Sequence, residues 1–147
     1  MDTRVGCYAW IERDGSVLLT YWSVPPFAPG MRHQGWTLPG GGMEPGEQTH
    51  ETAVREVAEE TGYEVEIEGL VGVDSLHRAA EQRPDGGTLP WHNLRIIYRA
   101  RIVGGEFAVE VDGTTADAGW FTRDQIAGLD RVGLVDVALR LVGDPIT

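Results

Sequence analysis

The sequence predicts an α/β (α+β) fold in which helices pack on a mixed β-sheet. Several segments alternate apolar and polar residues, which is typical of strands. Residues 48–61 have helical spacing, and a second amphipathic helix lies near the end of the chain. Because the 147 residues contain no internal repeat, we expect a single domain over residues 1–147.

The first two strands are expected to form a hairpin. Residues 5–11 alternate between apolar and polar positions, and residues 17–22 form the returning strand. Asp14-Gly15 between them is a typical hairpin turn. Residues 25–30 are rich in proline and break regular structure. A short strand at residues 36–38 then leads into a glycine-rich turn.

The middle of the chain contains the central helix and the two longest strands. The helix is expected at residues 48–61, with Gly62 as its left-handed cap. Alternation predicts strands at residues 65–76 and 94–102. Between them, residues 79–90 form a polar loop with proline and glycine, which we expect to close over a substrate.

The last part of the chain contains two more strands and two helices. Residues 104–105 turn the chain into a strand at 106–111, and another short strand ends at residues 120–121. A capping-box pattern at residues 122–125 opens a short helix. The final helix is expected to bury its apolar positions, which are Leu134, Val137, Ala138 and Leu141.

The charge balance limits the class of partner. The chain has 23 acidic and 12 basic residues, and its net charge is −11. Binding to nucleic acids depends on lysine and arginine at the phosphates, so we expect no nucleic-acid partner. A small anionic substrate stays compatible with this charge, because a bound metal ion can invert the sign of a site.

The sequence also suggests a cellular location. No apolar run approaches the length of a membrane span, so we expect no membrane partner. The first residues lack the pattern of a signal peptide. Cys7 is the only cysteine and cannot form an internal disulfide, which fits a reducing cytoplasm. Since Cys7 lies in an alternating strand, we interpret it as a buried structural residue and not as a nucleophile.

Three carboxylates cluster on the central helix. Glu56, Glu59 and Glu60 lie at positions i, i+3 and i+4, so they share one stripe opposite Ala53 and Val57. Like charges one turn apart destabilise a helix by about 0.2–0.5 kcal/mol per pair, which favours a compensating cation. Hard divalent ions such as Mg²⁺ or Mn²⁺ take oxygen ligands. The alternative is the solvated acidic face of a surface helix.

These glutamates belong to a longer pattern over residues 41–63, G-x5-E-x7-R-E-U-x-E-E-x-G-U, in which U is apolar. The residues at the specified positions are Gly41, Glu47, Arg55, Glu56, Val57, Glu59, Glu60 and Gly62. Only the last position departs, because Tyr63 replaces an aliphatic residue, and an aromatic ring can also pack there. The pattern resembles the Nudix box, so the sequence is similar to the Nudix hydrolase family.

The resemblance implies the Nudix fold, an α/β/α sandwich around a mixed β-sheet. It also implies metal-dependent hydrolysis of a phosphoanhydride bond in a nucleoside diphosphate linked to another moiety. Mg²⁺ or Mn²⁺ is the implied cofactor, because such an ion neutralises phosphate oxygens and acidifies a bound water. Its implied ligands are the carboxylates of Glu56, Glu59 and Glu60 and the carbonyl of Gly40.

The residues expected to act in catalysis are Glu56, Arg55, Glu47 and Asp117. Glu56 is the first candidate for the general base and Asp117 the second, unless Asp117 is simply a turn residue. Arg55 can hold Glu47 if Glu47 lies in the loop before the helix, and we expect Arg55 to orient this glutamate more than to contact substrate. Weaker alternatives for the base are Glu110 and Asp112.

The residues expected to bind substrate are Trp22, Arg95 and Gly41. Trp22, together with Trp10 and Tyr21, can stack a base for about 1–3 kcal/mol. The alternative is that these aromatic rings pack under a helix. Arg95 shares its strand face with two further arginines, which either meet phosphates or form a solvated face.

The identity of the substrate is less determined. Some Nudix subgroups carry a proline or a tyrosine downstream of the box, where this chain has residues 78–81 without either. We therefore expect a (d)NTP or a nucleotide sugar, with a preference for nucleoside triphosphates. The alternative function is a non-catalytic module that senses a nucleotide derivative. A homodimer is compatible with the sequence, since two-fold dimers are the commonest oligomers.

Overall fold

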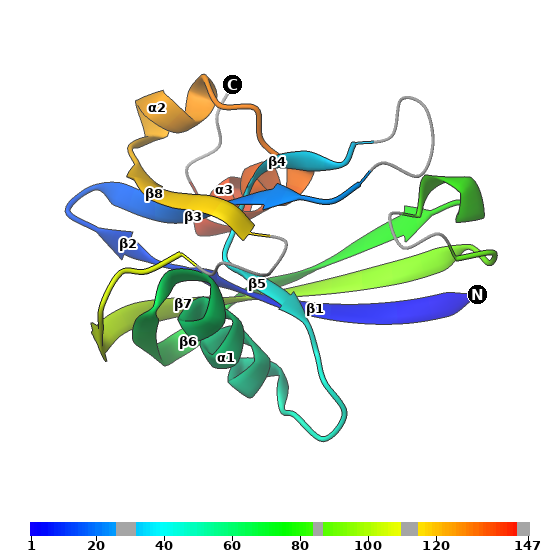
Figure 1. The fold of residues 1–147 in the computed structure, drawn as a ribbon, viewed down its shortest axis with the longest axis horizontal. Helices are drawn as coiled ribbons and strands as arrows, with labels where there is room; N and C mark the ends of the chain where they lie inside the picture. The colour runs from blue at the N-terminus through cyan, green and yellow to red at the C-terminus, as the bar shows by residue number, and fades with distance from the viewer. Residues whose placement is uncertain (26–31, 84–86, 110–114, 144–147) are drawn as a thin grey trace.

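The computed structural model describes residues 1–25, 32–83, 87–109 and 115–143 (Figure 1). It confirms the α+β class, with a mixed sheet and helices on both sides of it. Most of the proline-rich segment 25–30 lies outside the described residues, as do residues 84–86 of the expected loop. The alternative acids Glu110 and Asp112 also lie outside them.

One four-stranded sheet contains the long strands of the fold. Its strands are β1 (Asp2–Trp10), β5 (Gly40–Gly42), β6 (Tyr63–Arg78) and β7 (Trp91–Gly105). They are arranged in the order β5-β1-β7-β6, with β1 parallel to β7 and the other pairs antiparallel. The predicted strands at 65–76 and 94–102 are confirmed, and both extend further than the alternation indicated.

A second sheet contains β2 (Glu12–Arg13), β3 (Ser16–Ser23), β4 (Gln34–Thr37) and β8 (Thr115–Phe121). The expected hairpin is only partly correct. Asp14 and Gly15 form the turn with φ of 53° and 80°, but only the short β2 pairs beside it with β3. β1 instead joins the other sheet, because it pairs with β7 along its whole length.

The central helix, α1 (Thr49–Thr61), covers one face of the mixed sheet that contains β1, β5, β6 and β7 (Figure 1). Gln48 and Glu51 form a capping box at its start, and Gly62 caps its end in the left-handed conformation, as predicted. Val57 packs in a buried cluster with Ile11, which lies between β1 and β2, and with residues of β1, β3, β6 and β7, which are Ala9, Leu18, Val65 and Ala100. The opposite stripe of α1 therefore carries its charged residues.

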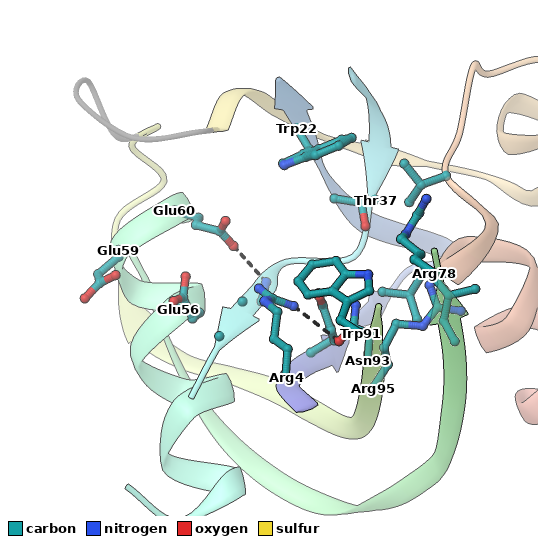
Figure 2. Close-up of a pocket in the computed structure, with 17 residues that line it drawn as sticks. Arg4, Trp22, Thr37, Glu56, Glu59, Glu60, Arg78, Trp91, Asn93 and Arg95 are labelled. Atoms are coloured by element: carbon teal, nitrogen blue, oxygen red, sulfur yellow. Dashed lines mark hydrogen bonds between the residues drawn. The ribbon is translucent and has the colours of Figure 1, made fainter. Parts of the chain in front are cut away.

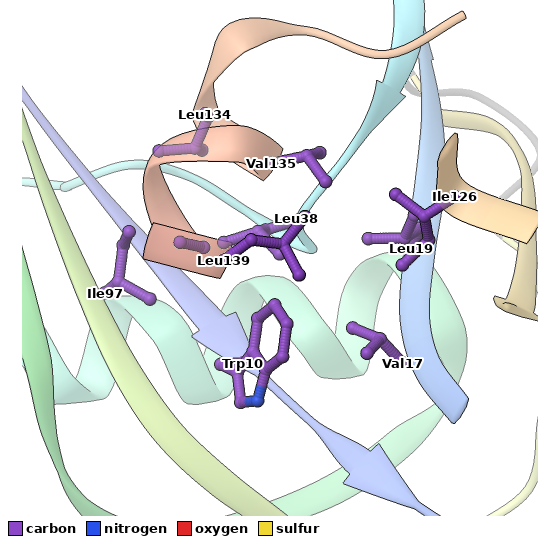
Figure 3. Close-up of a cluster of buried hydrophobic side chains, with 10 residues drawn as sticks. Trp10, Val17, Leu19, Leu38, Ile97, Ile126, Leu134, Val135 and Leu139 are labelled. Carbon is purple, nitrogen blue, oxygen red and sulfur yellow. The ribbon is translucent and has the colours of Figure 1, made fainter. Parts of the chain in front are cut away.

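On the other side lies α3 (Gly133–Val142), which contacts β6 and β4, while α2 (Arg123–Ala127) packs beside β8 (Figures 1 and 3). Thr122 caps α2 as predicted, since its hydroxyl accepts a hydrogen bond from the Gln125 backbone N–H. The buried residues of α3 are Leu134, Val135, Ala138 and Leu139, which pack on Trp10, Leu19 and Ile97. The expected apolar face was partly wrong, because Leu141 is 44% exposed and covers Gly72 of β6.

The strand expected at 106–111 is also wrong over its described part. Residues 106–109 belong to no strand. Instead of pairing with β7, this segment returns to the end of α1, where the Ala108 N–H donates to the Thr61 carbonyl over 2.8 Å. In the described part of the expected loop at 79–90, the chain forms a 3₁₀ turn, η1 (Ala80–Gln82). No helix in the described ranges is long and apolar enough to cross a membrane.

Candidate functional site

A cavity of about 410 Å³ opens between α1, β5 and one face of the mixed sheet (Figure 2). It brings together most of the residues that the sequence predicted for the site, which are Trp22, Gly40, Gly41, Glu56, Glu59, Glu60 and Arg95. Arg55 and Glu47 support this wall from outside the cavity lining, and Asp117 does not line it. The predicted acidic stripe of α1 therefore faces a cavity and not bulk solvent alone.

Glu60 is the most firmly held of the three glutamates. Its side chain is 7% exposed, and its Oε1 accepts a hydrogen bond from the Gly40 N–H over 2.8 Å. Its Oε2 accepts another from the Thr115 hydroxyl over 2.8 Å. The carboxylate thus joins α1 to β5 and to the start of β8. The sequence analysis missed Thr115, because its partner stands 55 residues earlier in the chain.

Glycines at the start of β5 allow the close approach of β1 and α1. Gly40 has φ of 152°, and a Cβ atom there would lie 2.3 Å from the Cys7 carbonyl oxygen. A Cβ atom on Gly41 would lie 2.8 Å from the Glu56 carboxylate. A side chain at either position would displace backbone or a carboxylate. Cys7 is buried as predicted, and burial raises the pKa of its thiol.

Arg55 reaches back to Glu47 in the loop before α1, as the sequence analysis expected. Its Nε and Nη2 donate to the two Glu47 oxygens over 2.7 and 3.0 Å, and Nη2 also donates to the Gly42 carbonyl. These bonds lower the pKa of Glu47 to about 2, and the same contact raises the pKa of Arg55. The pair holds the loop between β5 and α1 in place.

The same guanidinium neutralises the other two glutamates. Its Nη1 donates to Glu56 over 3.1 Å and to Glu59 over 3.1 Å. Within the described ranges, no three histidine, cysteine, aspartate or glutamate side chains converge closely enough to hold a metal ion by themselves. Glu59 is half exposed and can turn from Arg55 toward an ion, so the oxygen-rich wall fits a hard divalent cation after this rearrangement.

The two candidates for the general base lie in different environments. Glu56 lines the cavity and is 16% exposed. Asp117 is an exposed residue of β8, and its Oδ1 accepts a hydrogen bond from the adjacent Ala118 N–H over 2.8 Å. The geometry therefore favours Glu56, while the role of either residue stays a prediction.

The aromatic residues of the first strands divide between the site and the core. Trp22 lines the cavity, whereas Trp10 is fully buried in the hydrophobic cluster of Figure 3. Tyr21 contacts Trp36 edge to face, with ring centroids 5.2 Å apart. Of the three rings, only Trp22 is placed to stack on a ligand.

The arginines of β7 also differ in position, because one lines the cavity and two lie on the surface. Arg95 lines the cavity, and its Nε donates to Asp74 over 2.9 Å. Arg99 is exposed outside it, and Arg101 pairs with Glu66 on the surface. The solvated-face alternative thus describes Arg99 and Arg101, whereas Arg95 belongs to the site.

The cavity is also lined by polar or aromatic side chains that the sequence analysis did not name as site residues, and these include Arg4, Arg78, Trp91 and Asn93. Register places them together, because Arg4 pairs with Asn93 across β1 and β7, and Arg78 pairs with Trp91 across β6 and β7. Trp91 and Asn93 share the strand face of Arg95. The two-residue period of a strand could therefore have identified them as site residues once Arg95 was a candidate.

The domain family described as the NUDIX domain matches residues 2–138. The chain belongs to the Nudix family. A solved MutT NUDIX hydrolase from Burkholderia pseudomallei has a TM-score of 0.76 with this Nudix protein and is 31% identical to it, with 97% of this chain and 99% of the other covered. The fold inferred from the box is thereby confirmed.

Curated Nudix relatives carry different names. The ADP-ribose pyrophosphatase of Methanocaldococcus jannaschii is 33% identical over 108 residues, which are 73% of this chain and 56% of the relative. The NAD-capped RNA hydrolase NudC of Pectobacterium carotovorum is 35% identical over 120 residues, which are 78% of this chain and 39% of the relative. This Nudix protein spans about half of the length of the curated relatives that it matches.

Proposed function

We propose that this Nudix protein hydrolyses a phosphoanhydride bond in a nucleoside diphosphate linked to another moiety. The observation that carries the proposal is the wall of the cavity formed by Glu56, Glu59 and Glu60. Glu60 is fixed by two hydrogen bonds, and Glu56 lies against Gly41, where only a glycine leaves room for its carboxylate. The carboxylates are supported from behind by the pair between Arg55 and Glu47.

Mg²⁺ or Mn²⁺ is the proposed cofactor. Glu56, Glu59, Glu60 and the carbonyl of Gly40 would hold it, and the ion would supply neutralisation of the phosphates and a more acidic water. Glu56 is the proposed general base, because it lines the cavity with little exposure to solvent, whereas both oxygens of Glu60 already accept hydrogen bonds. Arg55 acts as a positioning residue through Glu47.

The organic part of the substrate is proposed to lie against Trp22, beyond the glutamates. A (d)NTP or a nucleotide sugar remains the proposed substrate class. ADP-ribose and NAD, which the names of two relatives contain, both include a diphosphate bridge, and this supports cleavage at such a bond. Cytoplasmic location and a homodimer stay predictions.

A panel of nucleoside triphosphates, nucleotide sugars and dinucleotides tests the proposal directly. We expect phosphate or nucleotide release at about 5 mM Mg²⁺, since Mg²⁺ sites bind loosely, and loss of turnover in Glu59→Gln and Glu60→Gln. Glu66→Gln is the matched control, because Glu66 is exposed on β6 and pairs with Arg101 outside the cavity. Binding of nucleotides without turnover of any diphosphate would instead support the sensing module.

A further inference from the structure

The end of the cavity farthest from the glutamates is basic. Figure 2 shows Arg78 and Arg95 gathered on one side of Trp91, with Glu56 and Glu59 on the other side. Arg4 also lines the cavity, nearer to the glutamates, and Asp74 pairs with Arg95. An excess of positive charge on one wall is unexpected in a chain of net charge −11. It indicates a bound anion.

Arg78 is a partly buried cation whose charge is not compensated by a neighbouring carboxylate among the described residues. Its side chain is part-buried, and within the described part of the chain it forms no hydrogen bond or ion pair. Burial lowers the pKa of its guanidinium, and the charge of Arg95 lowers it further. A buried cation without a carboxylate is costly unless a ligand compensates it.

Trp91 offers a second donor at the same place. It is 6% exposed, and its Nε1–H is buried without an acceptor. In Figure 2 the nitrogen edge of its indole is turned toward Arg78 and away from the glutamates. Arg83 covers the ring at 5.0 Å from its centroid and is itself held by Asp2, so the indole has a fixed orientation. Buried indole N–H groups usually have a partner.

We propose that this basic end binds a phosphomonoester on the organic part of the substrate, separate from the diphosphate cleaved beside the glutamates. The assignment rests on the proposed function for the position of the cleaved bond. A phosphomonoester carries about −1.5 to −2 charges at pH 7 and three acceptor oxygens, which matches the two guanidiniums of Arg78 and Arg95, and of these only Arg95 pairs with a carboxylate among the described residues. The planar guanidinium of Arg78 can donate to two of these oxygens, and the Trp91 N–H can donate to the third.

Calorimetric titration of the full chain with ribose 5-phosphate tests this assignment. The buffer contains EDTA and no divalent ion, so binding at the basic end is measured without hydrolysis. We expect Arg78→Gln to weaken binding by about tenfold or more, because hydrogen bonds to charged groups are strong. Trp91→Phe keeps an aromatic ring but removes the donor, and should weaken binding by about threefold to tenfold. Arg101→Gln, on the same strand but outside the cavity, should leave it unchanged.

Each result decides the assignment. No binding of ribose 5-phosphate by the natural protein, or equal affinity in Arg78→Gln and Arg101→Gln, would overturn it. Equal affinity for gluconate would replace the phosphomonoester by a carboxylate, and equal affinity for ribose would exclude an anion altogether. Because no divalent ion is present, a failed hydrolysis panel leaves this binding result intact, and a failed titration leaves the proposed hydrolysis intact.

Discussion

The two ends of the cavity differ in how their charges are compensated. At the acidic end, Arg55 contacts Glu47, Glu56 and Glu59, and Glu60 receives hydrogen bonds on both oxygens. At the basic end, Arg78 forms no hydrogen bond or ion pair within the described ranges, and the Trp91 N–H has no acceptor there. The acidic end is therefore held by contacts within the protein, whereas at the basic end the proposed phosphomonoester would supply the missing partner.

The acidic end should be the more sensitive to a single substitution in catalysis. Glu56→Gln removes the proposed base while keeping the shape of the side chain, so kcat should fall by about 10²–10⁴-fold. Steady-state phosphate release from the best substrate of the panel measures this effect. A small loss of kcat in Glu56→Gln together with a large loss in Asp117→Asn would identify Asp117 as the general base.

Gly41→Ala tests whether the position of Glu56 matters and not only its charge. The added Cβ would lie 2.8 Å from the carboxylate, so we expect activity to fall by about 10–100-fold, as for residues that orient metal ligands. Gly69→Ala on β6 is the matched control, because a Cβ there meets no atom within 4 Å. If the two variants retained equal activity, the close contact between Gly41 and Glu56 would not contribute to catalysis.

Asp74→Asn tests how far Asp74 compensates the charge of the basic end. Asp74 neutralises Arg95, so its replacement frees a second guanidinium for an anion. We expect ribose 5-phosphate to bind a few-fold more tightly in titrations with EDTA, because the lost charge is partly screened by solvent. Weaker binding in this variant would mean that Asp74 serves to position Arg95 and not to mask it.

The smallest expected effect is a pH dependence of stability at the Arg55–Glu47 pair. The pKa of Glu47 is lowered to about 2 in the folded protein from an ordinary value of 4.5. The carboxylate therefore stabilises the fold above about pH 4.5, and this contribution is lost as pH falls toward about 2. In thermal melts, the difference between the natural protein and Glu47→Gln should be larger at pH 7 than at pH 3. A difference independent of pH would exclude an electrostatic cause.

Local sequence was sufficient to predict the acidic end. Glu56, Glu59 and Glu60 lie within two turns of one helix, so helical geometry alone puts them on one stripe. Arg55 and Glu47 are eight residues apart, and the loop between β5 and α1 allows the contact. The capping of α1 by Gly62 followed from the same local rules.

Predictions that depended on partners far along the chain were less successful. The strand at residues 17–22 was predicted, but its main partners are β4 and β8, which no short-range turn signal indicates. The segment 106–109 was expected to extend a hairpin and instead contacts the end of α1. In α3 the helix was correct, but Val135 and Leu139 are fully buried, whereas Val137 is only partly buried and Leu141 is exposed.

The family, the central helix and the acidic wall could be predicted from the sequence, because all of these depend on residues close together in the chain. The meeting of Arg78 and Trp91 at the other end of the same cavity follows only from how the strands pair and pack. Arg4 hydrogen-bonds Asn93 across 89 residues of sequence, and this contact exists only through the register of β1 on β7. Register is selected by the packing of whole strands, which no local pattern contains.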